Sequence, residues 1–186
     1  MSTVKPFPPT LAPFVKDELW SQGSSVALKG CSQATTDREE CEILKGLLEL
    51  RGLHTLGDLQ ILIVEDFEPF STHLCGILGS LGFTNVVQAR DGEQAVELAR
   101  ELQPGLILLD LGLPKLGGLE VARRVRTVSP QSQILIVSSE TSEEIVEAAM
   151  AAGARGYVFK YCARAHVAVA LRAILNGETF VSPRSN

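Results

Sequence analysis

Leu106-Ile107-Leu108-Leu109-Asp110 is an apolar run that ends in a carboxylate, and it is the clearest indication of the fold. Three similar runs occur elsewhere, and each leads into polar or charged side chains: Ile61-Leu62-Ile63-Val64 into Glu65 and Asp66, Ile134-Leu135-Ile136-Val137 into Ser138, and Tyr157-Val158-Phe159 into Lys160. Short runs rich in Ile, Val and Leu, separated by helical patterns, are typical of buried strands in a parallel sheet.

Strands and helices are expected to alternate regularly from Asp58 onward. The predicted strands cover 60–65, 86–88, 106–109, 134–137 and 156–159, and the predicted helices cover 68–81, 92–102, 118–127, 142–152 and 164–176. This (βα)5 alternation predicts an α/β fold in which a parallel sheet lies between helices. Right-handed crossovers favour a doubly wound sheet.

Capping signals mark the starts of two of these helices. Asp91 with Gln94, and Thr141 with Glu144, have the spacing of a capping box. No Ser, Thr, Asp or Asn lies between 161 and 166, so the last helix should begin without a side-chain cap.

Charge and composition exclude several classes of function. The net charge is −5 and no basic block or basic helix occurs, so we expect no nucleic-acid-binding surface within this chain. The chain has neither a basic-then-apolar leader nor an apolar run near the length of a membrane span, which favours a soluble, cytoplasmic protein without a membrane partner. Its cysteines lack metal-binding spacing and are expected to be reduced thiols: Cys31, Cys41, Cys75 and Cys162.

Residues 1–57 are expected to form an extension to the domain. The first part, 1–34, is rich in Pro, Ser, Thr and Gly and should be largely disordered. Residues 36–51 can form a helix with an apolar side, which either docks on the domain, pairs with a partner helix or serves as a linker. The folded domain should then span 58–179, followed by a tail over 180–186.

The carboxyl edge of the predicted sheet should carry a divalent-cation site. Parallel strands share this edge, where ligands of open α/β sheets bind. Glu65, Asp66 and Asp110 would be close neighbours there, and like charges repel and raise one another's pKa unless a cation lies between them. Oxygen ligands without His or Cys fit Mg²⁺ or Mn²⁺ rather than zinc.

Asp110, Ser138 and Lys160 together suit the handling of a phosphoryl group. A carboxylate such as Asp110 can attack phosphorus and form an aspartyl phosphate, while the cation neutralises the phosphoryl oxygens. Ser138 can donate a hydrogen bond to the new phosphoryl group, and Lys160 can pair with it, or with Asp110 in its absence.

Residues 59–179 resemble the receiver domain of bacterial two-component response regulators. The resemblance rests on four motifs: Val64-Glu65-Asp66, Leu108-Leu109-Asp110-Leu111-Gly112-Leu113-Pro114 with Gly118, Val137-Ser138-Ser139 and Gly156-Tyr157-Val158-Phe159-Lys160. It implies a flavodoxin-like, five-stranded sheet with strand order 2-1-3-4-5. It also implies a phosphoprotein of two-component signal transduction rather than an enzyme.

The resemblance further assigns roles to individual residues. It implies that Mg²⁺, or Mn²⁺, is bound by Glu65, Asp66, Asp110 and the backbone carbonyl of Gly112. Asp110 would be phosphorylated by a partner histidine kinase. Ser138 and Tyr157 would form a coupled switch, in which the hydroxyl moves toward the phosphoryl group and the aromatic ring turns inward. The output face would be built from residues about 142–176, through which receiver domains often form homodimers.

Three positions depart from the pattern of the family. Ser138 replaces the more frequent threonine and keeps the hydroxyl, and Tyr161 follows Lys160 where Pro, Asp or Ser is usual. Phe67 follows the acid pair where a polar residue is commoner, and we expect it to alter access to the metal.

The output of the switch is not indicated by the sequence. Residues 170–183 resemble the receiver end of regulators with a helix-turn-helix output domain, but the chain stops at Asn186, so DNA binding is not carried over to it. Two other interpretations compete with the switch: a degenerate receiver that serves as a protein-interaction scaffold, and an aspartyl-phosphate hydrolase. The hydrolase is disfavoured because Gly112 stands where the haloacid dehalogenase superfamily has a second Asp.

Overall fold

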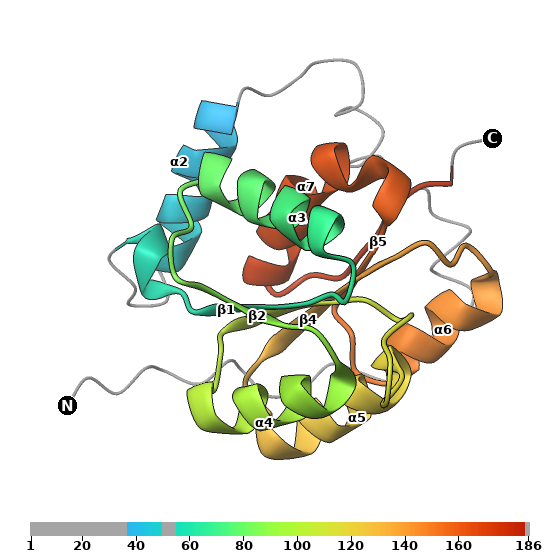
Figure 1. Cartoon of the computed structure of the whole chain (residues 1–186). Coiled ribbons are helices and arrows are strands. Elements are labelled where there is room, and N and C mark those ends of the chain that lie inside the picture. The colour runs from blue at the N-terminus through green and yellow to red at the C-terminus, as the bar shows by residue number, and fades with distance from the viewer. Residues whose placement is uncertain (1–36, 50–54, 185–186) are drawn as a thin grey trace.

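The structure, a computed structural model, describes residues 37–49 and 55–184, and a parallel six-stranded sheet forms its centre (Figure 1). The strands lie in the order β2-β1-β3-β4-β5-β6. Their bounds are β1 Ile61–Val64, β2 Val86–Ala89, β3 Leu106–Leu109, β4 Gln133–Ser138, β5 Gly156–Phe159 and β6 Phe180–Val181. The arrangement of the first five strands confirms the predicted doubly wound, flavodoxin-like fold.

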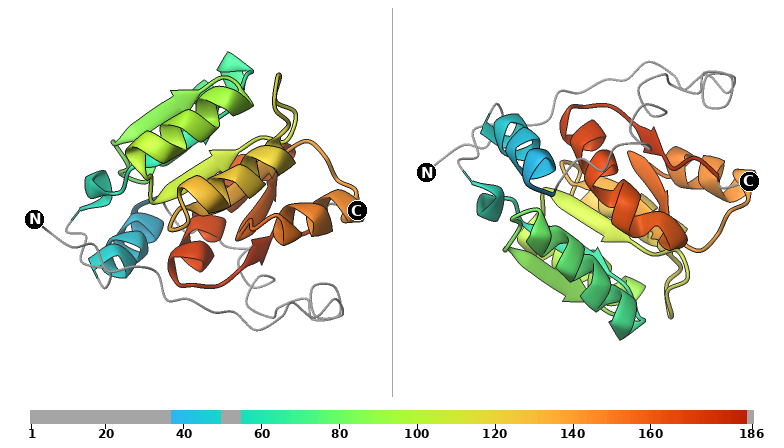
Figure 2. Two further views of the ribbon diagram at one scale, coloured as in Figure 1. Left: turned by 90° about the horizontal axis from the view of Figure 1, so that it is seen from below. Right: turned by 90° about the horizontal axis from the view of Figure 1, so that it is seen from above.

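Helices cover both faces of the sheet, as the views from below and above show (Figure 2). One layer contains α3 (Glu68–Ser80) and α7 (Ala163–Leu175). The other layer contains α4 (Gly92–Leu102), α5 (Gly118–Val128) and α6 (Glu143–Ala151). The two layers remove both faces of the central strands from water, which is the usual environment of parallel sheets.

Alternate residues of each strand face opposite helical layers, as strand geometry requires. In β1, Ile61 and Ile63 pack in one core with residues of α3 and α7, whereas Leu62 and Val64 pack in a second core with residues of α4 and α5. All four side chains are buried, and burying one such side chain stabilises the fold by about 1.5–3 kcal/mol. Two aliphatic cores therefore hold the central strands and fix where each strand ends.

A short sixth strand, β6, extends the predicted five-stranded sheet. It pairs with β5, so that Phe180 lies opposite Gly156 and Val181 opposite Tyr157. The N–H of Ser182 continues the pairing by donating to the Tyr157 carbonyl at 2.8 Å. The sequence placed these residues in a tail, because a strand of two residues carries no periodicity.

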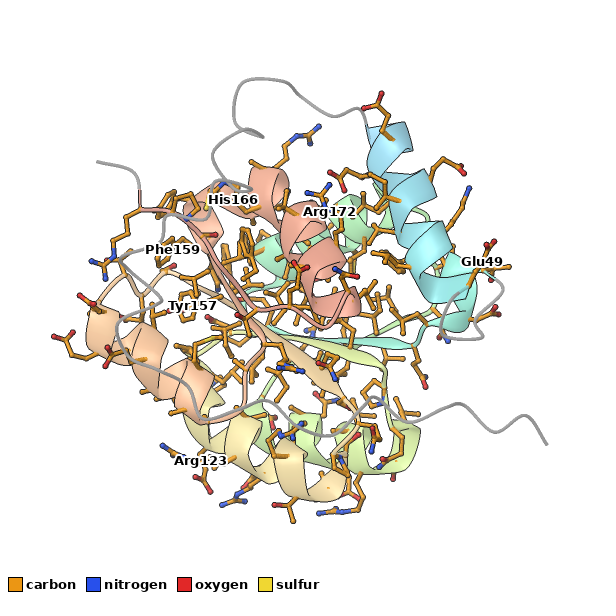
Figure 3. All side chains as sticks on the ribbon, turned by 180° about the vertical axis from the view of Figure 1, so that it is seen from behind. Glu49, Arg123, Tyr157, Phe159, His166 and Arg172 are labelled. Carbon is orange, nitrogen blue, oxygen red and sulfur yellow. The ribbon has the colours of Figure 1, made fainter. Side chains whose placement is uncertain are left out.

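Helix α2 (Asp37–Glu49) lies in the predicted extension and packs against α7. Its Leu44 is fully buried in the same core as the short turn η1 (Leu56–Asp58). Arg172 of α7 donates a hydrogen bond from Nη1 to Oε1 of the buried Glu40 at 3.0 Å, and Figure 3 shows Arg172 facing α2. The described part of the extension is therefore docked on the domain.

Some predictions fall on residues that the structure does not describe. The expected disorder over 1–34, with Cys31, lies outside the described ranges, and the domain boundary at Asp58 stays a prediction. Among the described residues, no helix combines the length and apolar character needed to cross a membrane. Cys41, Cys75 and Cys162 are free thiols.

Helix starts follow the local sequence signals with one difference. Asp91 caps α4 as predicted, because its side chain accepts a hydrogen bond from the Gln94 N–H at 2.9 Å. Ser142 rather than Thr141 caps α6, through a hydrogen bond from a backbone N–H of the first turn. Two adjacent hydroxyls offer the same chemistry, so the sequence alone did not fix this start. Helix α7 has no side-chain cap, as predicted, and is entered through the turn η2 (Lys160–Cys162).

Candidate functional site

The strand register sets Glu65 and Asp110 side by side at the carboxyl edge of the sheet. Val64 of β1 pairs with Leu109 of β3, so the next residue of each strand leaves the sheet at the same level. Backbone hydrogen bonds continue past the strands, from the Glu65 N–H to the Ala89 carbonyl and from the Asp110 N–H to the Val64 carbonyl, both at 3.0 Å. The backbone therefore fixes the origin of both carboxylates.

Three carboxylates gather at this edge. Glu65, Asp66 and Asp110 each offer an oxygen, and these oxygens all lie within 4.8 Å of one another. The side chains of Glu65 and Asp110 are 1% and 9% exposed, whereas Asp66 is open to solvent. Glu65 Oε2 is buried, and its charged neighbour is the ammonium group of Lys160, which Asp110 also contacts. The donor type and the spacing of the three carboxylates fit Mg²⁺.

Lys160 reaches the two buried carboxylates from the end of β5. Its Nζ lies 2.6 Å from Glu65 Oε2 and 3.0 Å from Asp110 Oδ2, and its side chain is 18% exposed. Burial alone would lower the pKa of Lys160, but the two neighbouring carboxylates raise it above its usual value. The lysine is therefore a firmly positive group beside the acids.

Glu65 carries the least favourable charge of the site. Burial raises the pKa of its carboxyl group, the contact with Lys160 lowers it in part, and the charge of Asp110 raises it again. One lysine does not neutralise two buried carboxylates, so an excess of negative charge is held where water is scarce. This excess favours the binding of a cation.

Gly118 lets the loop after β3 fold closely around Asp110. A Cβ on Gly118 would lie 2.2 Å from the Asp110 carbonyl oxygen, so only glycine fits at the start of α5. Gly112 adjoins the carboxylate, since a Cβ there would lie 3.4 Å from Asp110 Oδ2. The Leu111 N–H donates to Asp110 Oδ1 at 2.8 Å, which orients the other oxygen toward Lys160.

Ser138 and Tyr157 meet at the backbone of Glu140. The Glu140 N–H donates to Ser138 Oγ at 3.3 Å, and the Tyr157 hydroxyl donates to the Glu140 carbonyl at 2.9 Å. Both side chains are buried, and burial raises the pKa of Tyr157 to about 12. The ring of Tyr157 thus lies in the inward position, and sequence reasoning did not anticipate that Glu140 would link the two residues.

The phenyl ring of Phe70 also adjoins the site, and sequence reasoning missed it. Lys160 Nζ lies 4.7 Å from the centre of this ring. Phe70 looks like an ordinary apolar position of α3, and its place in the first turn after the acid pair was the only signal. Phe67, by contrast, is 61% exposed, and its backbone N–H donates to Glu65 Oε1 at 3.2 Å.

Fold and site together define a class of protein. The molecule is a flavodoxin-like α/β domain whose carboxyl edge brings together three acids and an ammonium group, and the buried Ser138 ends strand β4 at the same edge. Such an edge can hold a divalent cation through its carboxylates, present one carboxylate as a nucleophile and pair a transferred anionic group with the lysine.

The chain belongs to the family of response regulator receiver domains, whose description, "Response regulator receiver domain", matches residues 61–172. Response regulator GacA of Pseudomonas aeruginosa is 31% identical over 127 residues, which cover 68% of this chain and 59% of GacA. The nitrate/nitrite response regulator protein NarL of Escherichia coli is 35% identical over 123 residues, which cover 66% of this chain and 57% of NarL. The chain thus spans less than two thirds of the length of these relatives.

Solved structures show the same fold. A two-component response regulator of the LuxR family from Aurantimonas sp. is 30% identical, with a TM-score of 0.61, over 67% of this chain and 89% of that one. The receiver domain of a sensor histidine kinase from Pseudomonas aeruginosa is 29% identical, with a TM-score of 0.58, over 63% of this chain and 98% of that one. That second structure has a magnesium ion coordinated in its active site cleft.

Proposed function

We propose that this chain is a phosphorylation switch in which Asp110 accepts a phosphoryl group from a sensor histidine kinase in a Mg²⁺-dependent reaction. The observation that carries the proposal is the position of Lys160 between Glu65 and Asp110. A structural ion pair needs only one carboxylate, and a second buried acid costs stability. Two carboxylates and one ammonium group have a function together when the carboxylates bind a cation and the ammonium group pairs with a phosphoryl group.

Asp110 is the nucleophile in this proposal. One of its carboxylate oxygens forms a bond to phosphorus while the bond between phosphorus and the imidazole nitrogen of the donor breaks. A bound Mg²⁺ would neutralise the phosphoryl oxygens and align the attack. The residues that would hold it are Glu65, Asp66, Asp110 and Gly112, the last through its backbone carbonyl. Lys160 then turns its ammonium from the Asp110 carboxylate to the transferred group.

Ser138 and Tyr157 carry the change to the output face formed by α6, β5 and α7. The Ser138 hydroxyl turns toward the phosphoryl group and takes the loop at Glu140 with it. Support for this coupling comes from the two hydrogen bonds that tie Ser138 and Tyr157 to the Glu140 backbone. A change of charge at one end of the sheet would then bias a two-state element on the output face.

The proposed setting is the cytoplasm, with a histidine kinase upstream and an effector protein downstream. The free thiols of Cys41, Cys75 and Cys162 are consistent with a reducing compartment. We also propose that the output face is where a second copy of the chain would bind.

Beryllofluoride, a mimic of the phosphoryl group, tests this proposal. With Mg²⁺ present it should shift the amide NMR signals of residues around Asp110, Ser138 and Tyr157. Asp110→Asn should abolish the shifts, whereas the matched change Asp91→Asn at the cap of α4 should leave them intact. An Asp110→Asn protein that responds like the wild type would overturn the phosphoacceptor assignment.

A further inference from the structure

We propose that Phe70 is a positioning residue that holds the ammonium group of Lys160 where it can pair with the phosphoryl group. This inference deepens the proposed function and rests on it. Its starting point is the contact between Lys160 Nζ and the face of the Phe70 ring, 4.7 Å from the ring centre. A cation above an aromatic face is attracted by the negative charge density of the ring.

Lys160 needs such a support because its side chain is long and flexible. It begins at the end of β5, whereas Glu65 follows β1, and β3 and β4 lie between these two strands in the sheet. The side chain therefore extends across the edge of the sheet to reach its partners. An unsupported ammonium at the end of four methylene groups would sample many positions, and only some of them face Asp110.

The ring is the partner of Lys160 that stays the same during the proposed reaction. Glu65 and Asp110 would turn toward a cation, and Asp110 would become an acyl phosphate. Phe70 is uncharged and its backbone is held in the first turn of α3, where its N–H donates to the Phe67 carbonyl at 3.0 Å. It also packs against the buried core beneath that helix. The ring can therefore keep the ammonium in place both before and after phosphoryl transfer.

A packing role alone predicts a different response to substitution. A residue that only filled space could be replaced by another apolar residue of similar size. The attraction to Lys160 needs an aromatic face, which tyrosine provides and leucine does not. Phe180 offers a matched control, because it is also a phenylalanine packed against the same core but lies opposite Gly156, at the amino end of β5.

The test is the affinity for beryllofluoride at saturating Mg²⁺, measured by NMR titration of the whole chain. Phe70→Leu should weaken the affinity by about three- to tenfold, the range of a partly desolvated cation–ring contact. Phe70→Tyr should stay within about twofold of the wild type, because the ring face is retained. Phe180→Leu should not change it. Urea unfolding of each variant checks that the domain is intact, and Phe70→Met replaces Phe70→Leu if leucine prevents folding.

The outcomes separate this inference from the function on which it rests. A wild-type chain that ignores beryllofluoride overturns the proposed function and the role of Phe70 together. A wild-type chain that binds it, with Phe70→Leu binding equally well, overturns the role of Phe70 alone. A Phe70→Tyr variant as weak as Phe70→Leu has the same meaning, because the aromatic face would then not be what matters.

Discussion

Two ion pairs of equal length lie in opposite environments of this molecule. Lys160 Nζ and Asp110 Oδ2 are 3.0 Å apart at the carboxyl edge of the sheet, where the side chains are 18% and 9% exposed. Arg124 Nε and Glu120 Oε1 are also 3.0 Å apart, on the outer side of α5, where the side chains are 53% and 43% exposed. Distance alone does not distinguish the two pairs.

The two pairs differ in how much hydration their charged groups have lost. The exposed pair on α5 remains solvated, and such pairs contribute little to stability. The pair at the sheet edge has given up much of its hydration, and a further acid, Glu65, competes for the same lysine. A folded protein keeps such an arrangement at a cost in stability, and perturbed charges of this kind are typical of functional sites.

Removing Lys160 is expected to have the largest effect on this comparison. Lys160→Met leaves Glu65 and Asp110 as neighbouring buried acids, which should lower the free energy of unfolding by about 2–4 kcal/mol. Added Mg²⁺ should restore part of the loss, because it supplies the missing positive charge. Urea unfolding with and without Mg²⁺ measures both effects.

The matched change at the exposed pair is Arg124→Met, which should not alter the unfolding midpoint measurably. The distinction between the two environments would fail if Lys160→Met left the unfolding midpoint unchanged as well. It would also fail if Mg²⁺ stabilised neither Lys160→Met nor the wild type.

The contact between α2 and α7 should give an intermediate effect. Arg172→Met removes the partner of Glu40, which is buried although the arginine is partly exposed. A stranded carboxylate of this kind should cost about 1–2 kcal/mol of unfolding free energy. The control is Lys45→Met, which breaks an exposed pair with Glu42 on the same helix and should have no measurable effect. Equal losses in the two variants would contradict the docking of α2 on α7.

The smallest expected effect is on the pH dependence of stability, through the Asp91 cap of α4. The Gln94 N–H and Lys115 hold the pKa of Asp91 below its usual value. A carboxyl group with a lowered pKa stabilises the folded state above its unfolded pKa of about 3.9, and this contribution is lost as the pH falls through the lower folded value. Asp91→Asn keeps a capping side chain but should flatten this part of the stability–pH curve. Urea unfolding at a series of acidic pH values measures this. If the unfolding free energy of Asp91→Asn fell with pH as steeply as that of the wild type, the ionised cap would be contradicted.

The order and type of the central elements followed from the sequence for a simple reason. Apolar runs separated by helical periodicity leave few arrangements other than a doubly wound parallel sheet. Contacts between residues far apart in the chain could not be predicted from the sequence. Glu40 and Arg172 are separated by 132 positions and touch only because α2 packs on α7. Strand β6 was missed because two residues carry no pattern.

At the site, sequence reasoning found the groups that carry charge and missed those that hold them. Glu65, Asp110 and Lys160 stand out because each directly follows a buried strand, and the carboxyl ends of parallel strands share one edge of the sheet. Phe70 resembles any core residue of an amphipathic helix, so its contact with Lys160 appears only in three dimensions. The same holds for Glu140, whose backbone rather than side chain joins the two proposed switch residues.

The most direct test of the central claim is the site of phosphorylation itself. After incubation with acetyl phosphate and Mg²⁺, mass spectrometry of the intact chain should show the gain of one phosphoryl group, and fragmentation should locate it on Asp110. The gain should disappear when Mg²⁺ is chelated and in the Asp110→Asn variant. A chain that gains no mass, or gains it on a residue other than Asp110, would contradict the account.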